Sequence, residues 1–224
     1  MKTKTELVIS LDLSDFEKVK KIVSAIDVET YKIGPVPFSA FGNKILEYLS
    51  DKKIFLDFKF FDIPSVISKA IKNFSKYPLK YITVHTRSGE ETIKQAKESA
   101  GETKVLGVTI LTSERADRKV ETILQMCKTA KQGGADGVVC PADCAMFVKE
   151  KFPELLITTP GVRLEEDKAK TNDHISSETP YNAVRNGADI IVIGRPILEA
   201  ENPRETLKKI REDIERAEKE KGRI

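Results

Sequence analysis

A strongly apolar stretch, IFLDFKFFDIPS at residues 54–65, contains the charged residues Asp57, Lys59 and Asp62. A run this apolar is typical of a buried strand that leads into a turn. Charges of both signs grouped in such a segment favour a site that acts on a ligand through its electrostatics. The alternative is an ion pair that only holds the fold together. Such a pair contributes little net stability, because desolvation offsets the attraction.

Side chains alternate between the two faces of a strand, and this alternation separates the charges from the apolar residues. Ile54, Leu56 and Phe58 share the face that we expect to pack against helices. Asp57 and Lys59 therefore share the opposite, inward face. The same parity places further polar residues on inward faces near strand ends: Ser10, Asp12, Thr83 and His85. Polar groups gathered at strand ends indicate the mouth of a barrel, where barrel enzymes carry their active sites.

Strand-like runs and amphipathic helical patterns alternate along the whole chain. The expected strands cover residues 7–13, 30–33, 54–59, 81–85, 105–111, 137–140, 155–159 and 190–193. The expected helices cover residues 15–25, 41–49, 65–74, 90–99, 119–131, 142–151, 181–186 and 204–219. This alternation favours parallel strands and predicts an α/β fold, a single-domain (β/α)8 TIM barrel over residues 1–224. An open doubly wound sheet is the alternative, but no G-x-G-x-x-G motif follows the first strand to support it.

Two strand ends near the C-terminus indicate a phosphate site. The last expected strand closes on Gly194 and Arg195, and barrels often bind phosphate after strands seven and eight. Glycine lets the backbone approach the anion, and arginine supplies a forked charge. The preceding strand ends in TTPGVR, which includes Arg163, and a long polar segment follows it. Such a loop is usually a functional lid, and the alternative is a surface loop in which Arg163 is solvated.

Composition and charge argue against several classes of protein. The chain has 224 residues with 38 basic and 35 acidic side chains, and its net charge of +3 is too balanced to indicate a nucleic-acid partner. No window approaches a membrane-spanning length of uninterrupted apolar residues, so no membrane span is expected. The N-terminus shows no signal peptide. The three cysteines are too few for a disulfide framework and favour the reducing cytoplasm.

A metal site is not expected from the metal-binding residue types. Cys140 and Cys144 lie close in sequence, but the chain has only 2 histidines, His85 and His174. A structural zinc site normally needs four ligands, so small buried cysteines are the simpler interpretation.

The order and spacing of several motifs resemble those of the orotidine 5'-phosphate decarboxylase family. The most specific motif is Asp57-x-Lys59-x-x-Asp62-Ile63-Pro64. The supporting motifs are Asp12 in SLDL, Lys32 in YKIGPVPF, His85 in TVHTRSG, LTS at residues 111–113, TPGVR at residues 159–163 and IGRPI at residues 193–197. The resemblance extends from LDLSD to IGRPI and so covers most of the chain.

The resemblance implies a homodimeric (β/α)8 enzyme that uses no metal and no organic cofactor and has its active sites at the dimer interface. Its reaction is the decarboxylation of orotidine 5'-phosphate to UMP and CO2 in de novo pyrimidine biosynthesis. By resemblance, Asp57 lies against the substrate carboxylate. Lys59 stabilises the developing carbanion and protonates it. Asp62 is expected to enter from the partner subunit and to fix Lys59 and the ribose.

The remaining site residues are also assigned by resemblance. Asp12 and Lys32 are expected to hold the ribose hydroxyls and the charge network, and Thr112 is expected to contact the pyrimidine. The other expected substrate contacts are Ile63 and Pro160, with Arg163, His174, Gly194 and Arg195 gripping the phosphate. Val66 stands where the family usually has threonine, and His174 stands where it often has glutamine. Val66 cannot donate a hydrogen bond, so these departures concern affinity more than reaction type.

Two other functions remain as alternatives. The magnesium-dependent sugar-phosphate decarboxylases and hexulose-phosphate synthases share the barrel and the Asp-x-Lys-x-x-Asp motif. They typically carry a glutamate metal ligand where this chain has Lys32, a cation that would repel Mg2+. A non-catalytic protein that binds a phosphate ligand on a barrel is the second alternative, because fold alone does not exclude it. The intact set of Asp57, Lys59 and Asp62 argues against that second alternative.

Overall fold

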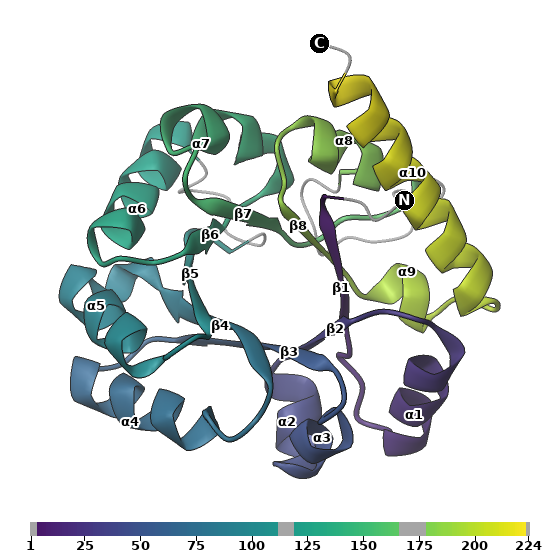
Figure 1. Cartoon of the computed structure of the whole chain (residues 1–224), viewed down its shortest axis with the longest axis horizontal. Coiled ribbons are helices and arrows are strands. Elements are labelled where there is room, and N and C mark those ends of the chain that lie inside the picture. Colours follow the sequence, from purple (N-terminus) through teal and green to yellow (C-terminus); the bar gives the residue numbers. More distant parts are fainter. Residues whose placement is uncertain (1–3, 112–118, 166–177, 223–224) are drawn as a thin grey trace.

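The computed structural model describes residues 4–111, 119–165 and 178–222, and these residues form a closed barrel of parallel strands (Figure 1). The strands are β1 (Glu6–Ser10), β2 (Thr30–Ile33), β3 (Lys53–Phe60), β4 (Leu79–His85), β5 (Lys104–Val108), β6 (Gly137–Val139), β7 (Leu156–Thr159) and β8 (Ile190–Ile193). β1 pairs with β8, with Glu6 opposite Ile190 and Ile9 opposite Ile193, and this pairing closes the ring. The expected (β/α)8 barrel is therefore confirmed.

Helices surround the ring of strands, as Figure 1 shows. They are α1 (Phe16–Ala25), α2 (Pro35–Phe41), α3 (Lys44–Tyr48), α4 (Pro64–Phe74), α5 (Glu90–Ser99), α6 (Val120–Gln132), α7 (Ala145–Lys151), α8 (Pro180–Arg185), α9 (Arg195–Leu198) and α10 (Pro203–Lys221), with short 3-10 turns η1 (Thr86–Ser88) and η2 (Ala142–Cys144). In α10 the buried residues Leu207, Ile210, Ile214 and Ala217 recur at three- and four-residue spacing. This spacing buries one face of α10 and leaves most of its charged residues exposed.

Local sequence signals set the starts of several helices. Asp15 caps α1, where its side chain accepts hydrogen bonds from the backbone N–H groups of Glu17 and Lys18. Pro64 and Pro180 occupy the first turns of α4 and α8, where a missing backbone N–H costs nothing. Because Pro64 starts α4 so soon after β3, the turn between them stays at the mouth of the barrel.

Two apolar layers lie on the two sides of the strands. Ile9, Leu56 and Ile82 belong to the layer between the strands and the helices. The interior of the barrel is filled by a second cluster: Val8, Phe55, Tyr81, Leu106, Val108, Val139, Ile190 and Val192. Leu56 and Phe55 therefore face opposite ways, and the strand parity inferred from the sequence is confirmed.

The N-terminal end of the barrel is closed by a polar network around Glu6. Tyr81 and Thr30 each donate a hydrogen bond of 2.6 Å to its carboxylate, and Lys80 forms an ion pair with it at 2.8 Å. Burial, followed by the hydrogen bond to Glu6, raises the pKa of Tyr81 well above its ordinary value, so its hydroxyl remains a donor.

Several elements differ from the sequence expectation: the strands expected to reach residues 13 and 111 end at Ser10 and Val108, and the helix expected over residues 142–151 is split into η2 and α7. The single helix expected over residues 41–49 is replaced by α2 and α3, which are separated by Gly42 at φ 57°. Pro35 and Pro37 lie at the start of α2, where proline is tolerated because the first N–H groups of a helix have no intrahelical partner. The one-turn helix α9 after β8 was likewise not expected, and it begins at Arg195.

No helix within residues 4–111, 119–165 and 178–222 is long and apolar enough to cross a membrane. The three cysteines lie in these ranges, are buried and form no disulfide. Burial raises the pKa of the Cys127 thiol to about 12 and raises that of Cys140 as well. Protonated, buried thiols behave as small apolar side chains.

Candidate active site

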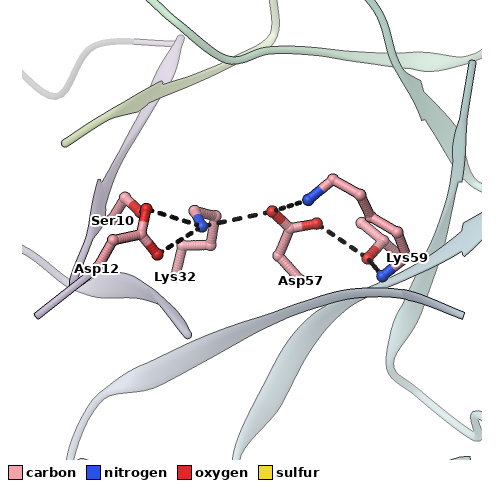
Figure 2. Close-up of polar contacts among 6 residues, drawn as sticks. Ser10, Asp12, Lys32, Asp57 and Lys59 are labelled. Atoms are coloured by element: carbon pink, nitrogen blue, oxygen red, sulfur yellow. Dashed lines mark hydrogen bonds and ion pairs between the residues drawn. The ribbon is translucent and has the colours of Figure 1, made fainter. Parts of the chain in front are cut away.

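Charged side chains form a continuous series at the C-terminal ends of β1, β2 and β3 (Figure 2). Lys59 donates a hydrogen bond of 2.9 Å to Oδ2 of Asp57, and the ammonium group of Lys32 lies 3.4 Å from the same oxygen. Lys32 also contacts Asp12, with 3.3 Å between Nζ and Oδ1. Ser10 in turn donates a hydrogen bond of 2.6 Å to Oδ2 of Asp12. The charges alternate in sign along this series, so each cation has an anionic neighbour.

The carboxylate of Asp57 is kept ionised by its neighbours. Its side chain is only 11% exposed, and burial on its own raises the pKa. The charges of Lys32 and Lys59, with hydrogen bonds from Lys59 and Thr83, outweigh burial and hold the pKa below its ordinary value. A fixed, desolvated anion beside a cation can act strongly on a ligand, because little water screens either charge.

Lys59 lies at an irregular end of β3. It is the only residue other than glycine with a positive φ, 48°, in the described part of the chain. The register between β3 and β4 shifts between Leu56 and Phe60. The side chain of Lys59 lines the cavity described below and is 36% exposed. The lysine is thus reachable by a ligand, whereas Asp57 is almost covered.

A cavity of about 1020 Å³ opens beside these charges. Its lining combines the charged residues Asp12, Lys32, Asp57 and Lys59 with apolar side chains from β5, β6 and β8: Val108, Val139 and Val192. A largely apolar wall with a few fixed polar groups is the usual construction of a small-molecule site. The barrel interior therefore supplies the apolar part and the strand ends supply the chemistry.

The same cavity reaches the residues expected to bind phosphate. Pro160, Arg163, Gly194 and Arg195 all line it. Arg163 is 4% exposed, and its backbone N–H donates a hydrogen bond of 2.9 Å to the carbonyl of Glu178. The described ends of the polar segment after β7 therefore meet each other next to the cavity.

Asp62 and Ile63 are not among the residues that line the cavity of their own chain. Oδ1 of Asp62 accepts a hydrogen bond of 2.7 Å from the backbone N–H of Ile63. Ile63 is 62% exposed, and its neighbours Phe61 and Val66 are 65% and 44% exposed. The turn between β3 and α4, with the first turn of α4, thus presents apolar side chains and a carboxylate to the outside of the chain.

Thr112 and His174 lie outside the described residues. Their expected contacts with the pyrimidine and with the phosphate therefore stay predictions. The greater part of the polar segment that we expect to act as a lid, residues 166–177, also lies outside them.

Gly34 and Thr83 adjoin the charged series and carry no functional assignment from the sequence. A Cβ added at Gly34 would lie 3.2 Å from Nζ of Lys32 and 3.3 Å from Oδ1 of Asp12, so the ion pair closes over a position without a side chain. Thr83 hydrogen-bonds both Lys59 and Asp57. Its inward parity was the only available signal, and a glycine after a strand gives no sign of the groups that approach it.

Lys32 occupies the space between the carboxylates of Asp12 and Asp57 that a bridging divalent cation would need. Among the described residues, no group of three or more His, Cys, Asp or Glu side chains is arranged to hold a metal ion. Within the described site, the ammonium group of Lys32 thus lies between the two carboxylates and contacts both.

Comparisons with known proteins agree with these features. Residues 5–210 match the model of the "Orotidine 5'-phosphate decarboxylase / HUMPS family". The orotidine 5'-phosphate decarboxylase of Nostoc sp. is 33% identical over an alignment 232 positions long, which covers 93% of this chain and 97% of that protein. The enzyme of the same name from Fusobacterium nucleatum is 32% identical over an alignment 235 positions long, which covers 96% of this chain and 98% of that protein.

Solved structures give the same result. The orotidine 5'-phosphate decarboxylase from Lactobacillus acidophilus superimposes with a TM-score of 0.81 at 31% identity and covers 94% of this chain and 99% of its own. The orotidine 5'-phosphate decarboxylase from Thermotoga maritima superimposes with a TM-score of 0.72 at 30% identity and covers 92% of this chain and 98% of its own. The chain therefore belongs to the orotidine 5'-phosphate decarboxylase / HUMPS family, as one of its decarboxylases.

Proposed function

We propose that the protein converts orotidine 5'-phosphate to UMP and CO2 with neither a metal ion nor an organic cofactor, and that Lys59 donates the proton. The observation that carries the proposal is the contact of 2.9 Å between Lys59 and the buried carboxylate of Asp57, both on the lining of one cavity. The 33% identity to the orotidine 5'-phosphate decarboxylase of Nostoc sp. supports the choice of substrate.

The proposed mechanism uses the two charges in sequence. The substrate carboxylate enters beside Asp57, and repulsion between the two carboxylates raises the energy of the bound substrate. When the carbon–carbon bond breaks, CO2 leaves and the electron pair stays on the pyrimidine carbon. The ammonium group of Lys59 stabilises this carbanion by its charge and then transfers a proton to it, which forms UMP.

The remaining cavity residues are proposed to bind the nucleotide. Asp12 and Lys32 would contact the ribose hydroxyls, and their ion pair keeps both in place. The proposed phosphate contacts are Arg163, His174, Gly194 and Arg195, and the proposed pyrimidine and flanking contacts are Thr112, Ile63 and Pro160. A firm hold on the phosphate assists the reaction because remote binding energy can drive closure of the site over the reacting carbon.

We further propose a homodimer in which Asp62 is contributed to the site of the partner subunit. The exposed side chains of Phe61, Ile63 and Val66 support an interface at this turn, because exposed apolar clusters mark surfaces that bind other proteins. Asp62 lies within the same turn and is not among the residues lining its own cavity, which supports a role across the interface.

We also propose that the enzyme acts in de novo pyrimidine biosynthesis and that it does so in the cytoplasm. We also take residues 1–224 as one domain. The single ring that runs in order from β1 to β8 supports this assignment.

The decisive experiment is a turnover assay on orotidine 5'-phosphate with EDTA present. We expect UMP to form at the same rate with and without the chelator. Activity that is lost on chelation and restored by Mg2+ would point to the magnesium-dependent sugar-phosphate enzymes of the family. Tight binding of the nucleotide without turnover would instead indicate a non-catalytic binding protein.

A further inference from the structure

The backbone of Lys59 adopts a conformation that residues with a Cβ seldom take. Its φ of 48° lies in the left-handed region, which is crowded for any residue but glycine. The pairing of β3 with β4 is also irregular between Leu56 and Phe60, which brackets this position. The backbone N–H of Lys59 donates a hydrogen bond of 2.8 Å to Oγ1 of Thr83 on β4. A side chain on the neighbouring strand therefore secures the strained residue.

The hydroxyl of Thr83 makes two hydrogen bonds whose directions follow from their chemistry. A backbone N–H can only donate, so Oγ1 of Thr83 accepts from Lys59. The one hydroxyl hydrogen is then available to Oδ1 of Asp57, which lies 3.0 Å away. Thr83 is 0% exposed and is not among the residues that line the cavity. It therefore acts on the site only through Asp57 and Lys59.

The two oxygens of the Asp57 carboxylate have different partners. Oδ1 accepts from Thr83, whereas Oδ2 contacts Lys59 at 2.9 Å and Lys32 at 3.4 Å. Fixing Oδ1 stops the carboxylate from rotating, so Oδ2 stays directed at the two ammonium groups. The same hydroxyl also fixes the backbone from which the side chain of Lys59 extends. Oγ1 of Thr83 thus holds both the carboxylate of Asp57 and the backbone of Lys59.

We propose that Thr83 is a positioning residue, which sets the relative geometry of Asp57 and Lys59 and on which the rate of the chemical step depends. The inference rests on the proposed function, in which these two residues act on the same substrate. Small misplacements of reacting groups slow a reaction strongly, so the loss should fall on kcat. Binding of the phosphate and ribose is assigned to other residues, so KM should change little.

Thr109 provides a matched control. It is also 0% exposed, and its hydroxyl donates a hydrogen bond of 2.8 Å to the carbonyl of Val139. This bond joins the end of β5 to β6 and contacts neither Asp57 nor Lys59. Thr109→Val therefore removes a buried threonine hydroxyl without touching the charged pair.

The test measures kcat, KM and melting temperature with orotidine 5'-phosphate for the wild type, Thr83→Val, Thr83→Ser and Thr109→Val. We expect Thr83→Val to lower kcat by about 100-fold, with KM within about threefold of the wild type. Thr83→Ser keeps the hydroxyl and should restore kcat to within about fivefold of the wild type. Thr109→Val should keep kcat within about twofold even if its melting temperature falls.

A folded Thr83→Val protein with the kcat of the wild type overturns the inference. A folded Thr83→Ser protein as slow as Thr83→Val overturns it too, because the hydroxyl would then not be the cause. If Thr83→Val does not fold, the kcat of Thr83→Ala decides in its place by the same criterion. The wild-type measurement separates failure of this inference from failure of the proposed function. A wild type without turnover overturns the proposed function, whereas an active wild type with an equally active Thr83→Val variant overturns only the role of Thr83.

Discussion

The ammonium group of Lys32 lies 3.4 Å from Oδ2 of Asp57, the same oxygen that Lys59 contacts. Lys32 contacts Asp12 as well, so two cations and two anions share one site and their charges cancel. A substrate carboxylate therefore meets a series of four side chains whose own charges sum to zero. In the proposed mechanism, the position of the substrate determines which charge acts on which group. Its carboxylate lies against Asp57, and the carbon that loses CO2 lies against Lys59.

Replacement of Lys59 by alanine should abolish most of the decarboxylation. Lys59 is the cation that the proposed mechanism uses both to stabilise and to protonate the carbanion, so we expect Lys59→Ala to lower kcat by at least about 1,000-fold. The fold should persist, because Asp57 keeps its contact with Lys32. Turnover and the circular dichroism spectrum of the variant check both statements. A folded variant with near wild-type turnover would remove Lys59 from the proposed mechanism.

Asp57 and Asp62 should complement each other between subunits. If Asp62 serves the partner's site, Asp57→Ala and Asp62→Ala should each be nearly inactive alone. In a heterodimer of the two, one site carries both substitutions and the other carries neither. Random exchange in a two-fold dimer should then restore about a quarter of the wild-type activity.

This measurement needs conditions under which subunits exchange, with heterodimers confirmed by native mass spectrometry. The unmixed variants, treated in the same way, are the control. Confirmed heterodimers without recovered activity would show that both aspartates serve the site of one chain.

Replacement of Gly34 by alanine should displace the ion pair between Lys32 and Asp12 without changing either charged residue. The Cβ of Gly34→Ala would lie 3.2 Å from Nζ of Lys32 and 3.3 Å from Oδ1 of Asp12, closer than ordinary contact. The ends of both side chains must shift by a few tenths of an ångström. Because rate is sensitive to such shifts, we expect kcat/KM to fall by about tenfold with little change in stability.

Gly222→Ala is the control for this substitution. An added Cβ there meets the carbonyl of Glu218 at 3.5 Å, an ordinary contact, at the end of α10 and far in sequence from the charged series. It should leave kcat/KM unchanged. Equal kinetics for Gly34→Ala and the wild type would show that the Lys32–Asp12 pair tolerates displacement.

Because the pKa of Asp57 is lowered in the folded protein, the contribution of Asp57 to the free energy of unfolding depends on pH. A carboxylate whose pKa is lower in the folded state stabilises the fold above its ordinary pKa of 3.8, and this contribution is lost as the pH falls below that value. Asp57→Asn removes the titrating group and leaves Lys32 and Lys59 without their shared anion. We expect the variant to be less stable by about 3 kcal/mol at pH 7, and the difference should shrink toward pH 3.

Urea unfolding of both proteins at pH 7 and at pH 3 measures this difference. Comparison with the variant cancels the titration of the other carboxylates. A stability difference that stays constant between the two pH values would contradict an ionised, stabilising Asp57 in the folded protein.

The alternation of side chains along a strand is a property of the chain itself, so the sequence correctly predicted that Asp57 faces inward and Leu56 outward. The spacing of strand-like and helical segments likewise predicted the barrel. The ends of the elements were less predictable, because α2 starts with prolines that also suit a loop. Such boundaries depend on packing against the rest of the molecule.

The role of Thr83 could not be predicted, because it depends on the register shift between Leu56 and Phe60. That shift arises between two strands and has no signature in either strand alone. The close approach at Gly34 also depends on contacts between elements, since one approaching group is Lys32 on β2 and the other is Asp12, which follows β1. The charged residues that sequence reasoning singled out on β2 and β3 do lie together in the structure. Sequence reasoning missed the neutral residues that contact them.

The proposed proton donor, Lys59, occupies a backbone conformation that is unfavourable for a residue with a Cβ. A residue with a Cβ costs about 1–2 kcal/mol in this conformation, which glycine adopts freely. Glycine at position 59 would relieve this strain but would also remove the ion pair with Asp57 and, under the proposed mechanism, the proton donor. Engineering of a more robust enzyme should leave the end of β3 unchanged and seek its gains at the N-terminal end of the barrel, around Glu6.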